Sequence, residues 1–211
     1  MVKSMLLPGR APWVTTCIEL YIDNSNLYMK DLRWKKISSE YLLHDTWGTV
    51  RKDVCETREG KIIDPYYVYE FPTWVTAVAV TTDHKIIVER QYRYALDTVN
   101  FEIPGGCVDD TDASLEAAIA RELMEETGYR FDHYEYLGKT SANPSTNNNW
   151  MHMFLATGGR YEREQQLDHN EEIEVYLFSV DEVKKMLAEN QIIQSMHVTA
   201  LYYGLSKMKS L

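Results

Sequence analysis

The chain's densest group of reactive side chains lies in the acidic segment RELMEETGY, residues 121–129. On a helix, Glu122, Glu125 and Glu126 would fall on one side. A turn at Gly105-Gly106 lies shortly upstream. Protein carboxylates bind Mg²⁺ together with substrate phosphates, and glycine lets the backbone approach such ligands closely. These residues therefore predict a site for a divalent metal and a phosphate, and hence an enzyme.

A helix is predicted over residues 114–127, because Ser114 can cap its start and Gly128 can end it. On a helical wheel, Glu122 and Glu126 fall inside the apolar stripe rather than opposite it. That stripe consists of Leu115, Ala118, Ile119 and Leu123. Like charges four residues apart repel each other, more so when partly buried, so a cation is needed to neutralise them. The alternative is a plain acidic helix end, which would oppose the helix dipole.

Composition limits the classes of function that remain. The chain has 211 residues, a net charge of -10 and a hydrophobic fraction of 45%, which suits one domain with or without a small appendage. Acidic chains bind polyanions poorly, so no nucleic-acid partner is expected. No stretch approaches the roughly 20 apolar residues of a membrane span, and the apolar run near the start is too short for a signal peptide. The three cysteines show no metal-ligand spacing. We therefore expect a cytoplasmic protein without a membrane partner.

The elements that must position the acidic segment are mainly strands in the first half of the chain and helices near the end. Alternating and β-branched runs predict strands at residues 15–22, 39–43, 48–55, 62–71, 73–80, 85–92, 134–141, 151–158 and 174–179. Further helices are predicted at 181–189 and 193–207. This order of elements indicates an α+β fold or an α-β-α sandwich.

The acidic segment resembles the Nudix box, whose pattern is G-x5-E-x7-R-E-U-x-E-E-x-G-U with U apolar. Residues 121–129 match the second half of that pattern throughout, with Tyr129 as the last apolar position. The resemblance implies a Nudix fold, which is an α-β-α sandwich with a mixed sheet. It also implies that water attacks a diphosphate phosphorus with the help of Mg²⁺, with Mn²⁺ as a possible substitute.

The first half of the box departs from the pattern. Counting back from Arg121, the box Glu falls on Ala113 and the box Gly on Cys107; counting forward from Gly106, the acidic position falls on Asp112. One residue is therefore inserted in the loop before the helix. The first box Glu steadies this loop in the family, and Asp112 is the residue that would do so here.

Over about residues 37–205 the chain resembles the ADP-ribose pyrophosphatase branch of this family. The runs that carry this likeness are DPYYV at 64–68, WV at 74–75, RQYR at 90–93 and EIPGG at 102–106. Pro144 is the fifteenth residue after Tyr129, a position associated in the family with ADP-ribose preference. The resemblance implies hydrolysis of ADP-ribose, or of a similar nucleoside diphosphate sugar, to AMP and a sugar phosphate. The alternatives are another substrate, such as GDP-mannose or a dinucleoside polyphosphate, and a non-catalytic module that senses a nucleotide.

The family match assigns roles around the metal. Glu122, Glu125, Glu126 and the carbonyl of Gly105 are the implied metal ligands. Arg121 would pair with the carboxylates and orient them, so Glu126 and Arg121 count as catalytic residues. The implied general base lies in the acidic loop at 168–172, where Glu171 is preferred and Glu172 is the alternative.

A further set of residues is expected to bind the substrate. Arg93 is a candidate clamp for the diphosphate, because a guanidinium pairs with phosphate in a fixed fork. Glu102 could orient Arg93 or bind a ribose hydroxyl. The full set of candidates is Arg93, Glu102, Trp47, Tyr66, Tyr67 and Pro144, with the aromatic residues as a surface for adenine. The alternatives without a functional role are that Arg93 is an ordinary surface residue and that the aromatic residues pack in the core.

Three regions are predicted along the chain. Residues 1–35 form an N-terminal extension of unknown role. Residues 36–71 form a β-meander which, by the resemblance, joins two chains in a homodimer and contributes to the partner's substrate site. Residues 72–211 form the Nudix hydrolase domain.

Overall fold

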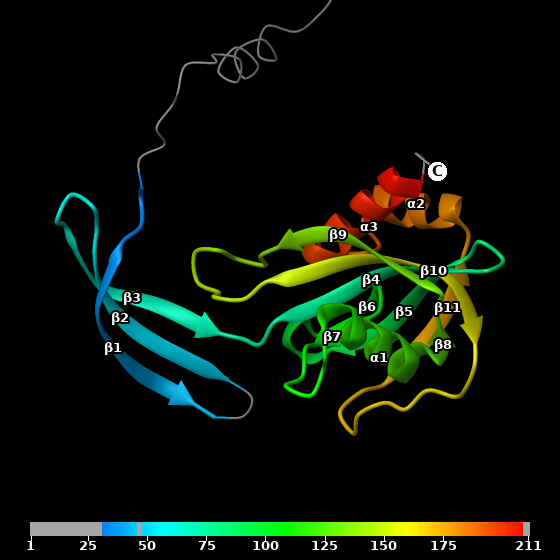
Figure 1. Cartoon of the computed structure of the whole chain (residues 1–211), viewed down its shortest axis with the longest axis horizontal. Coiled ribbons are helices and arrows are strands. Elements are labelled where there is room, and N and C mark those ends of the chain that lie inside the picture. Colours follow the sequence, from blue (N-terminus) through cyan, green and yellow to red (C-terminus); the bar gives the residue numbers. More distant parts are fainter. Residues whose placement is uncertain (1–30, 46–47, 209–211) are drawn as a thin grey trace, which may run out of the picture.

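The computed structural model describes residues 31–45 and 48–208, which form a small sheet beside a larger sheet that carries helices on both faces (Figure 1). The strand predicted at residues 15–22 and the residue Trp47 lie outside the described residues. None of the described helices is long and apolar enough to cross a lipid bilayer.

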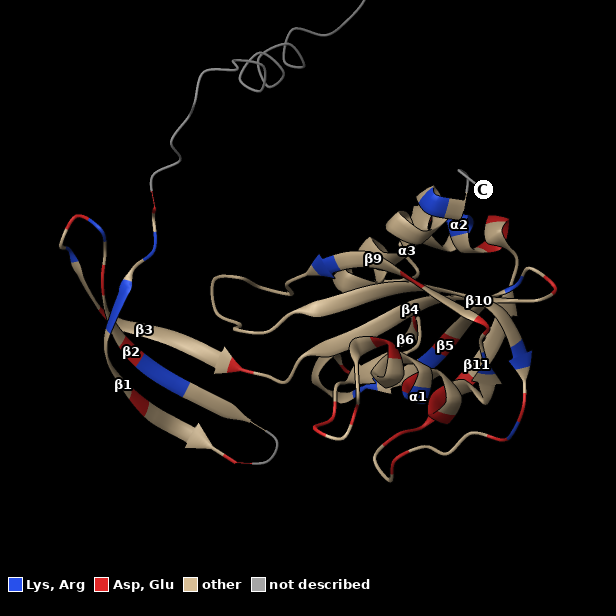
Figure 2. Cartoon of the chain, in the orientation of Figure 1, with Lys and Arg blue, Asp and Glu red and all other residues tan. Residues whose placement is uncertain are grey.

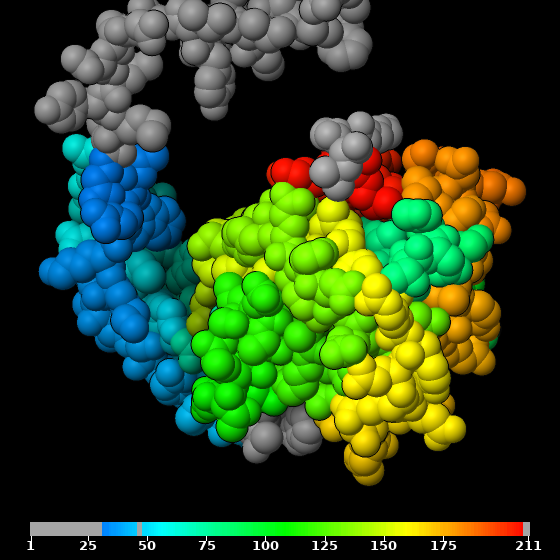
Figure 3. Space-filling view, turned by 45° about the vertical axis from the view of Figure 1, so that its right-hand side comes forward, coloured from blue at the N-terminus to red at the C-terminus, as the bar shows by residue number. Residues whose placement is uncertain are grey.

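The small sheet is an antiparallel meander of three strands in the order β1-β2-β3. Its strands are β1 (Lys35–His44), β2 (Thr49–Glu56) and β3 (Ile62–Glu70), which agrees with the strands predicted from the sequence. Every residue of β1 is exposed, and the space-filling view shows this blue strand on the outside of the molecule (Figure 3).

The large sheet is mixed, because β4 and β10 run parallel whereas their other neighbours run antiparallel. Its strands are β4 (Trp74–Thr81), β5 (Ile86–Arg93), β6 (Thr98–Glu102), β7 (Gly105–Cys107), β8 (Tyr129–Arg130), β9 (His133–Thr140), β10 (Met151–Tyr161) and β11 (Ile173–Phe178). The central path is β11-β5-β4-β10-β8, with β6 beside β5, β7 beside β4 and β9 beside β10.

Helices cover the large sheet on both faces. The helix α1 (Leu115–Thr127) packs over one hydrophobic cluster, and α2 (Val180–Ala188) and α3 (Ser195–Met208) pack over another. In β4, Ala77 belongs to the α1 cluster and Val78 to the other, so the strand is buried on both faces, as its continuous apolar run predicts. The predicted α-β-α sandwich is confirmed.

The strands β6, β7 and β8 are absent from the sequence-based prediction. In β6 the buried residues are Asn100 and Glu102, whereas Val99 is exposed. This reverses the pattern of apolar burial on which strand prediction depends. A short helical turn at Tyr94–Leu96 and a left-handed Asp97 separate β6 from β5.

The small sheet joins the rest of the molecule through β3 and the loop between β9 and β10. The Tyr69 N–H donates to the carbonyl of Thr146 (2.8 Å), and the Asn148 N–H donates to the carbonyl of Tyr69 (3.2 Å). The Tyr66 hydroxyl donates to the carbonyl of Ser145 (2.6 Å). One end of the small sheet is thus tied to the large one, while its outer strand stays open.

Candidate active site

A cleft of about 630 Å³ opens between α1, the turn at Gly105-Gly106, strands β5 and β6, and the start of α3. Its lining includes the predicted metal and catalytic residues Gly105, Arg121, Glu122, Glu125, Glu126 and Glu171. It also includes Arg93 and Glu102. Acidic residues gather on α1 and on the loops beside it (Figure 2).

The helix that carries the carboxylates begins and ends where the sequence predicts. The Ser114 hydroxyl accepts a hydrogen bond from the Ala117 N–H (3.1 Å), which caps the first turn. Gly128 adopts a left-handed conformation, and its N–H donates to the carbonyl of Met124 (3.1 Å). These two ends position Glu122, Glu125 and Glu126 in the lining of the cleft.

Glu126 is buried beneath the glycine turn. Only 6% of the residue is exposed, and its Oε2 accepts a hydrogen bond from the Gly105 N–H (2.8 Å). Burial raises the pKa of Glu126 well above its ordinary value, and the neighbouring carboxylate of Glu89 raises it further. The helical wheel correctly places Glu126 on the buried side of α1.

Glu122 lies so close to the turn that any side chain at position 106 would displace its carboxylate. A Cβ atom added to Gly106 would lie 2.4 Å from the Glu122 Oε1. Burial raises the pKa of Glu122 to about 7, although the charge of Arg121 acts to lower it. Two carboxylates are therefore held under a glycine turn without enough positive charge to offset them.

Arg121 engages part of this carboxylate group. Its guanidinium donates to Glu122 (3.1 Å) and to Glu125 (3.0 Å), and also to the carbonyl of Cys107 (2.9 Å). Glu126 is held by the backbone of Gly105 instead. Arg121 thus orients two of the three carboxylates and anchors them to β7.

The loop with the inserted residue is fixed by Asp112. Its Oδ2 accepts hydrogen bonds from Arg121 (2.9 Å) and from the Asp109 N–H (2.8 Å). Arg121 lowers the pKa of Asp112, so this carboxylate stays charged. Asp112, rather than Ala113, therefore stands where the box Glu would steady the loop.

Arg93 and Glu102 form a two-pronged ion pair at the side of the cleft, with nitrogen–oxygen distances of 2.8 and 2.7 Å. Glu102 is 3% exposed, whereas about half of the Arg93 side chain faces solvent. Glu102 thus holds Arg93 in place while leaving one side of the guanidinium open. This arrangement agrees with the idea that Glu102 orients Arg93.

His197 is a cleft residue that sequence reasoning missed. Its Nδ1 accepts the Ile103 N–H (3.4 Å) and lies 3.6 Å from a carboxylate oxygen of Glu102. Burial lowers the pKa of His197 to about 4, so its imidazole is neutral at pH 7. A lone histidine within an ordinary helical pattern offered no signal for this position.

Glu89 is the second missed residue. It is 4% exposed, and its Oε1 has no hydrogen-bond partner among the described residues. Burial raises the pKa of Glu89 well above its ordinary value, and the charge of Glu102 raises it further. A signal existed in the sequence, because Glu89 directly follows the apolar run at 86–88.

Glu171 lines the cleft, whereas Glu172 is exposed and does not belong to its lining. The Glu171 carboxylate accepts a hydrogen bond from the Asp168 N–H (3.1 Å), and its own N–H donates to the Asp168 carbonyl (3.0 Å). This geometry favours Glu171 over Glu172 as the predicted general base.

Tyr66, Tyr67 and Pro144 are not brought into this cleft. Tyr66 instead contacts the loop that contains Pro144, through the carbonyl of Ser145. Tyr67 is 47% exposed on the small sheet. The role of these residues in binding substrate stays a prediction.

The donor atoms of the cleft fit a divalent metal. Among residues 31–45 and 48–208, no three acidic, His or Cys side chains are already gathered as a set of metal ligands, and Arg121 holds Glu122 and Glu125 in ion pairs. The available donors are carboxylate oxygens, which suit a hard cation. The Oε1 of Glu89 is a further oxygen, and it accepts no hydrogen bond from the described residues.

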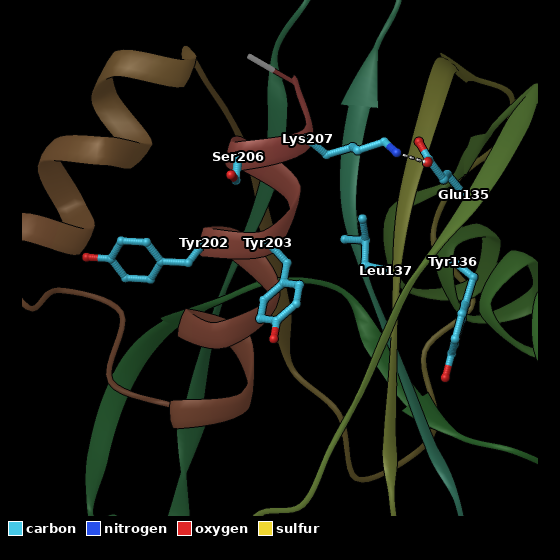
Figure 4. A pocket seen from close by; sticks show the side chains of 7 residues that line it. All are labelled: Glu135, Tyr136, Leu137, Tyr202, Tyr203, Ser206 and Lys207. Atoms are coloured by element: carbon cyan, nitrogen blue, oxygen red, sulfur yellow. Dashed lines mark ion pairs between the residues drawn. The ribbon is translucent and has the colours of Figure 1, made fainter. Parts of the chain in front are cut away.

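A second hollow, of about 470 Å³, lies between β9 and α3 (Figure 4). Its charged residues, Lys207 and Glu135, pair with each other at 2.6 Å. The remaining lining is largely made of tyrosines and a leucine. With its charges already paired, this hollow offers no counterpart to the carboxylates of the cleft.

Comparisons with known proteins match both sheets of the chain. A model of the NUDIX domain matches residues 72–197, and a model of the nucleoside diphosphate sugar hydrolase N-terminal domain matches residues 34–69.

Individual relatives cover much of the chain. A methanol dehydrogenase activator of Bacillus methanolicus is 30% identical over 64% of this chain and 74% of its own length. An ADP-ribose pyrophosphatase of Bacillus subtilis (strain 168) is 27% identical over 83% of this chain and 94% of its own. A solved structure, described as the crystal structure of ADP compounds hydrolase, superposes with a TM-score of 0.75 at 22% identity and covers 86% of this chain and 97% of its own. At that identity, the superposition shows a shared fold.

Proposed function

Because the protein belongs to the Nudix family, we propose that it hydrolyses the diphosphate bond of ADP-ribose, or of a similar nucleoside diphosphate sugar, to AMP and a sugar phosphate. The observation that carries this proposal is the pair of carboxylates, half-buried Glu122 and buried Glu126, held under the turn at Gly105-Gly106. The matching N-terminal domain model and the relatives named for ADP-ribose and ADP-sugars support the substrate class.

We propose Mg²⁺ as the metal, with Mn²⁺ as a substitute, and Glu122, Glu125, Glu126 and the Gly105 carbonyl as the groups that would hold it. Such an ion polarises phosphoryl oxygens and lowers the pKa of a bound water. The divalent metal is a general requirement of the family.

The chain's own residues would then handle the substrate. Arg121 keeps Glu122 and Glu125 in place through its fixed fork. Arg93, held by Glu102, presents its open side to the diphosphate. Glu171, which lines the cleft, would accept the proton of the attacking water.

We also propose a homodimer formed through the small sheet. The strand β1 is exposed along its whole length and pairs only with β2 among the described residues. A long, open edge strand with apolar side chains is a ready surface for another chain. In such a dimer, Tyr66 and Tyr67, together with Trp47, would form the adenine surface of the partner's cleft, with Pro144 beside Tyr66.

A hydrolysis screen tests the function. ADP-ribose, ADP-glucose, GDP-mannose and diadenosine polyphosphates are incubated with the protein, with Mg²⁺ or with a chelator, and the products are separated by chromatography. We expect Mg²⁺-dependent release of AMP from ADP-ribose or ADP-glucose. Preferred cleavage of GDP-mannose or of a dinucleoside polyphosphate would contradict the proposed substrate class. It would still agree with the hydrolysis of a diphosphate bond.

The substitution Glu126→Gln tests the metal site. It keeps the shape of the side chain and removes its charge, so we expect a loss of turnover of at least about 100-fold with the fold retained. The matched control is Glu116→Gln, at an exposed position on the same helix, which should keep full activity. Unchanged turnover in Glu126→Gln would reject the assignment of Glu126.

One relative carries the name of an activator of another enzyme, which favours a second candidate, a nucleotide-sensing module without hydrolysis. Calorimetry with ADP-ribose distinguishes the two. Tight binding of ADP-ribose, together with no product from any compound of the hydrolysis screen, would support the nucleotide-sensing function.

A further inference from the structure

We propose that Glu89 is a further ligand of the cleft and binds a divalent cation that it shares with Glu126. This inference rests on the proposed function, because it assigns an additional residue to the same metal site.

The register of β5 directs Glu89 toward α1. Side chains alternate between the two faces of a strand. Ile87 belongs to the hydrophobic cluster under α1, whereas Ile86 and Val88 belong to the cluster under α2 and α3. Glu89, two residues after Ile87, therefore lies on the face that α1 covers.

Strand pairing brings Glu89 next to the cleft. It lies directly opposite Glu102 of β6, and directly opposite residues of an antiparallel pair share a face of the sheet. Glu102 lines the cleft. Of the charged neighbours of Glu126, Glu89 has the largest effect on its pKa, which supports the closeness of these two carboxylates.

One oxygen of the buried Glu89 carboxyl group has no hydrogen-bond partner among the described residues. Glu89 is 4% exposed, and this oxygen is its Oε1. The nearby guanidinium of Arg93 is already engaged by both oxygens of Glu102. Buried charges in proteins are paired or coordinate metals. A bound cation would therefore neutralise the Glu89 carboxylate and occupy its unpartnered oxygen.

Binding of Mn²⁺, followed by electron paramagnetic resonance without substrate, tests the assignment. In Glu89→Gln we expect either loss of a bound Mn²⁺ or Mn²⁺ binding about tenfold weaker than in the wild type. Loss of a group that only supports a metal ligand already weakens binding by about this factor. Glu89→Asp retains a carboxylate and should bind better than Glu89→Gln. The matched control is Glu174→Gln, on the neighbouring strand β11, where the exposed carboxylate pairs with Arg90; its Mn²⁺ binding should equal that of the wild type.

Thermal unfolding gives a second reading that does not need activity. Removing a buried carboxyl group that lacks a compensating partner should leave the metal-free Glu89→Gln protein at least as stable as the wild type. Its gain in melting temperature on adding Mg²⁺ should be smaller, because a ligand stabilises only by the affinity that it has for the folded state.

The outcomes separate this inference from the proposed function. If Glu126→Gln weakens Mn²⁺ binding while Glu89→Gln binds as the wild type does, the metal site stands and the role of Glu89 is rejected. If Glu126→Gln also binds as the wild type does, the metal site itself fails. A metal-free Glu89→Gln protein that is less stable than the wild type, with an unchanged Mg²⁺ response, would assign Glu89 a purely structural role.

Discussion

Glu122 and Glu126 occupy helix positions that packing alone would give to apolar residues. Burying carboxylates costs free energy unless a cation or hydrogen bonds compensate. Arg121 supplies part of this compensation through contacts with Glu122, Glu125 and Asp112. Such departures from simple patterning are typical of functional sites.

Replacing Arg121 by lysine tests whether the fork geometry matters. The lysine ammonium group is one compact charge, so it cannot make all the contacts that the planar guanidinium of Arg121 makes. We expect Arg121→Lys to reduce hydrolysis by about tenfold and the free energy of unfolding by about 1–2 kcal/mol, measured by steady-state kinetics and urea titration. Arg160→Lys is the control, because Arg160 pairs with Asp132 at an exposed surface site. Equal losses in both variants would contradict a special role for Arg121.

His197 predicts a pH dependence of stability. Burial lowers its pKa from 6.5 to about 4, so between these values the unfolded chain binds more protons than the folded one. Its contribution is therefore present above pH 6.5 and lost as the pH falls toward 4, by about 3 kcal/mol in total. The raised pKa of Glu122 acts in the opposite direction, so the wild type must be compared with His197→Gln. We expect the difference in unfolding free energy between the two proteins to change by this amount between pH 7 and pH 4; a constant difference would contradict the titration.

At the scale of elements, the site depends on one helix meeting one short strand. The caps at Ser114 and Gly128 determine where α1 begins and ends. The strand β7 pairs with β4, with Gly106 opposite Val75. Because β7 lacks side chains at Gly105 and Gly106, the carboxylates of α1 can reach its backbone.

The substitution Gly106→Ala tests this close approach. Its Cβ would lie 2.4 Å from the Glu122 Oε1, so Glu122 must move. We expect activity to fall by at least about tenfold because misplaced catalytic groups lose rate steeply, while circular dichroism shows a folded protein. In the control, Gly48→Ala, the nearest atom lies at 3.4 Å, and activity should be kept. Full activity in Gly106→Ala would show that the fit is not required.

At the scale of the whole molecule, the small sheet stands apart from the cleft of its own chain. It is tied to the large sheet by β3, and β1 remains open (Figure 3). The aromatic residues Tyr66 and Tyr67 lie on this sheet, away from the cleft of their own chain. A homodimer would cover β1 and bring these rings to another cleft.

The dimer proposal predicts an effect of charge on β1. Leu43 is 48% exposed, and a buried aspartate at an interface would be unpaired. We expect Leu43→Asp to shift the protein from dimer to monomer in analytical ultracentrifugation and to raise the KM for ADP-ribose. Tyr202→Asp, on the exposed face of α3, should leave the oligomeric state unchanged. A wild type that sediments as a monomer would contradict the proposal directly.

The sequence by itself determined α1, its capping residues, the buried strand β4 and the grouping of Glu122, Glu125 and Glu126 on one side of α1. These features depend on local periodicity and on neighbours a few turns apart, which can be read along one segment.

Only the tertiary structure decided the strand β6 and the places of His197 and Glu89. Each depends on contacts between distant segments: Glu89 faces Glu102 across a strand pair, and His197 meets Ile103 from the last helix. In β6 the buried residues are polar, because the strand lines a charged cleft instead of an apolar core. Local patterning cannot reveal the buried polar residues of β6, since their burial is determined by what the rest of the fold places beside them.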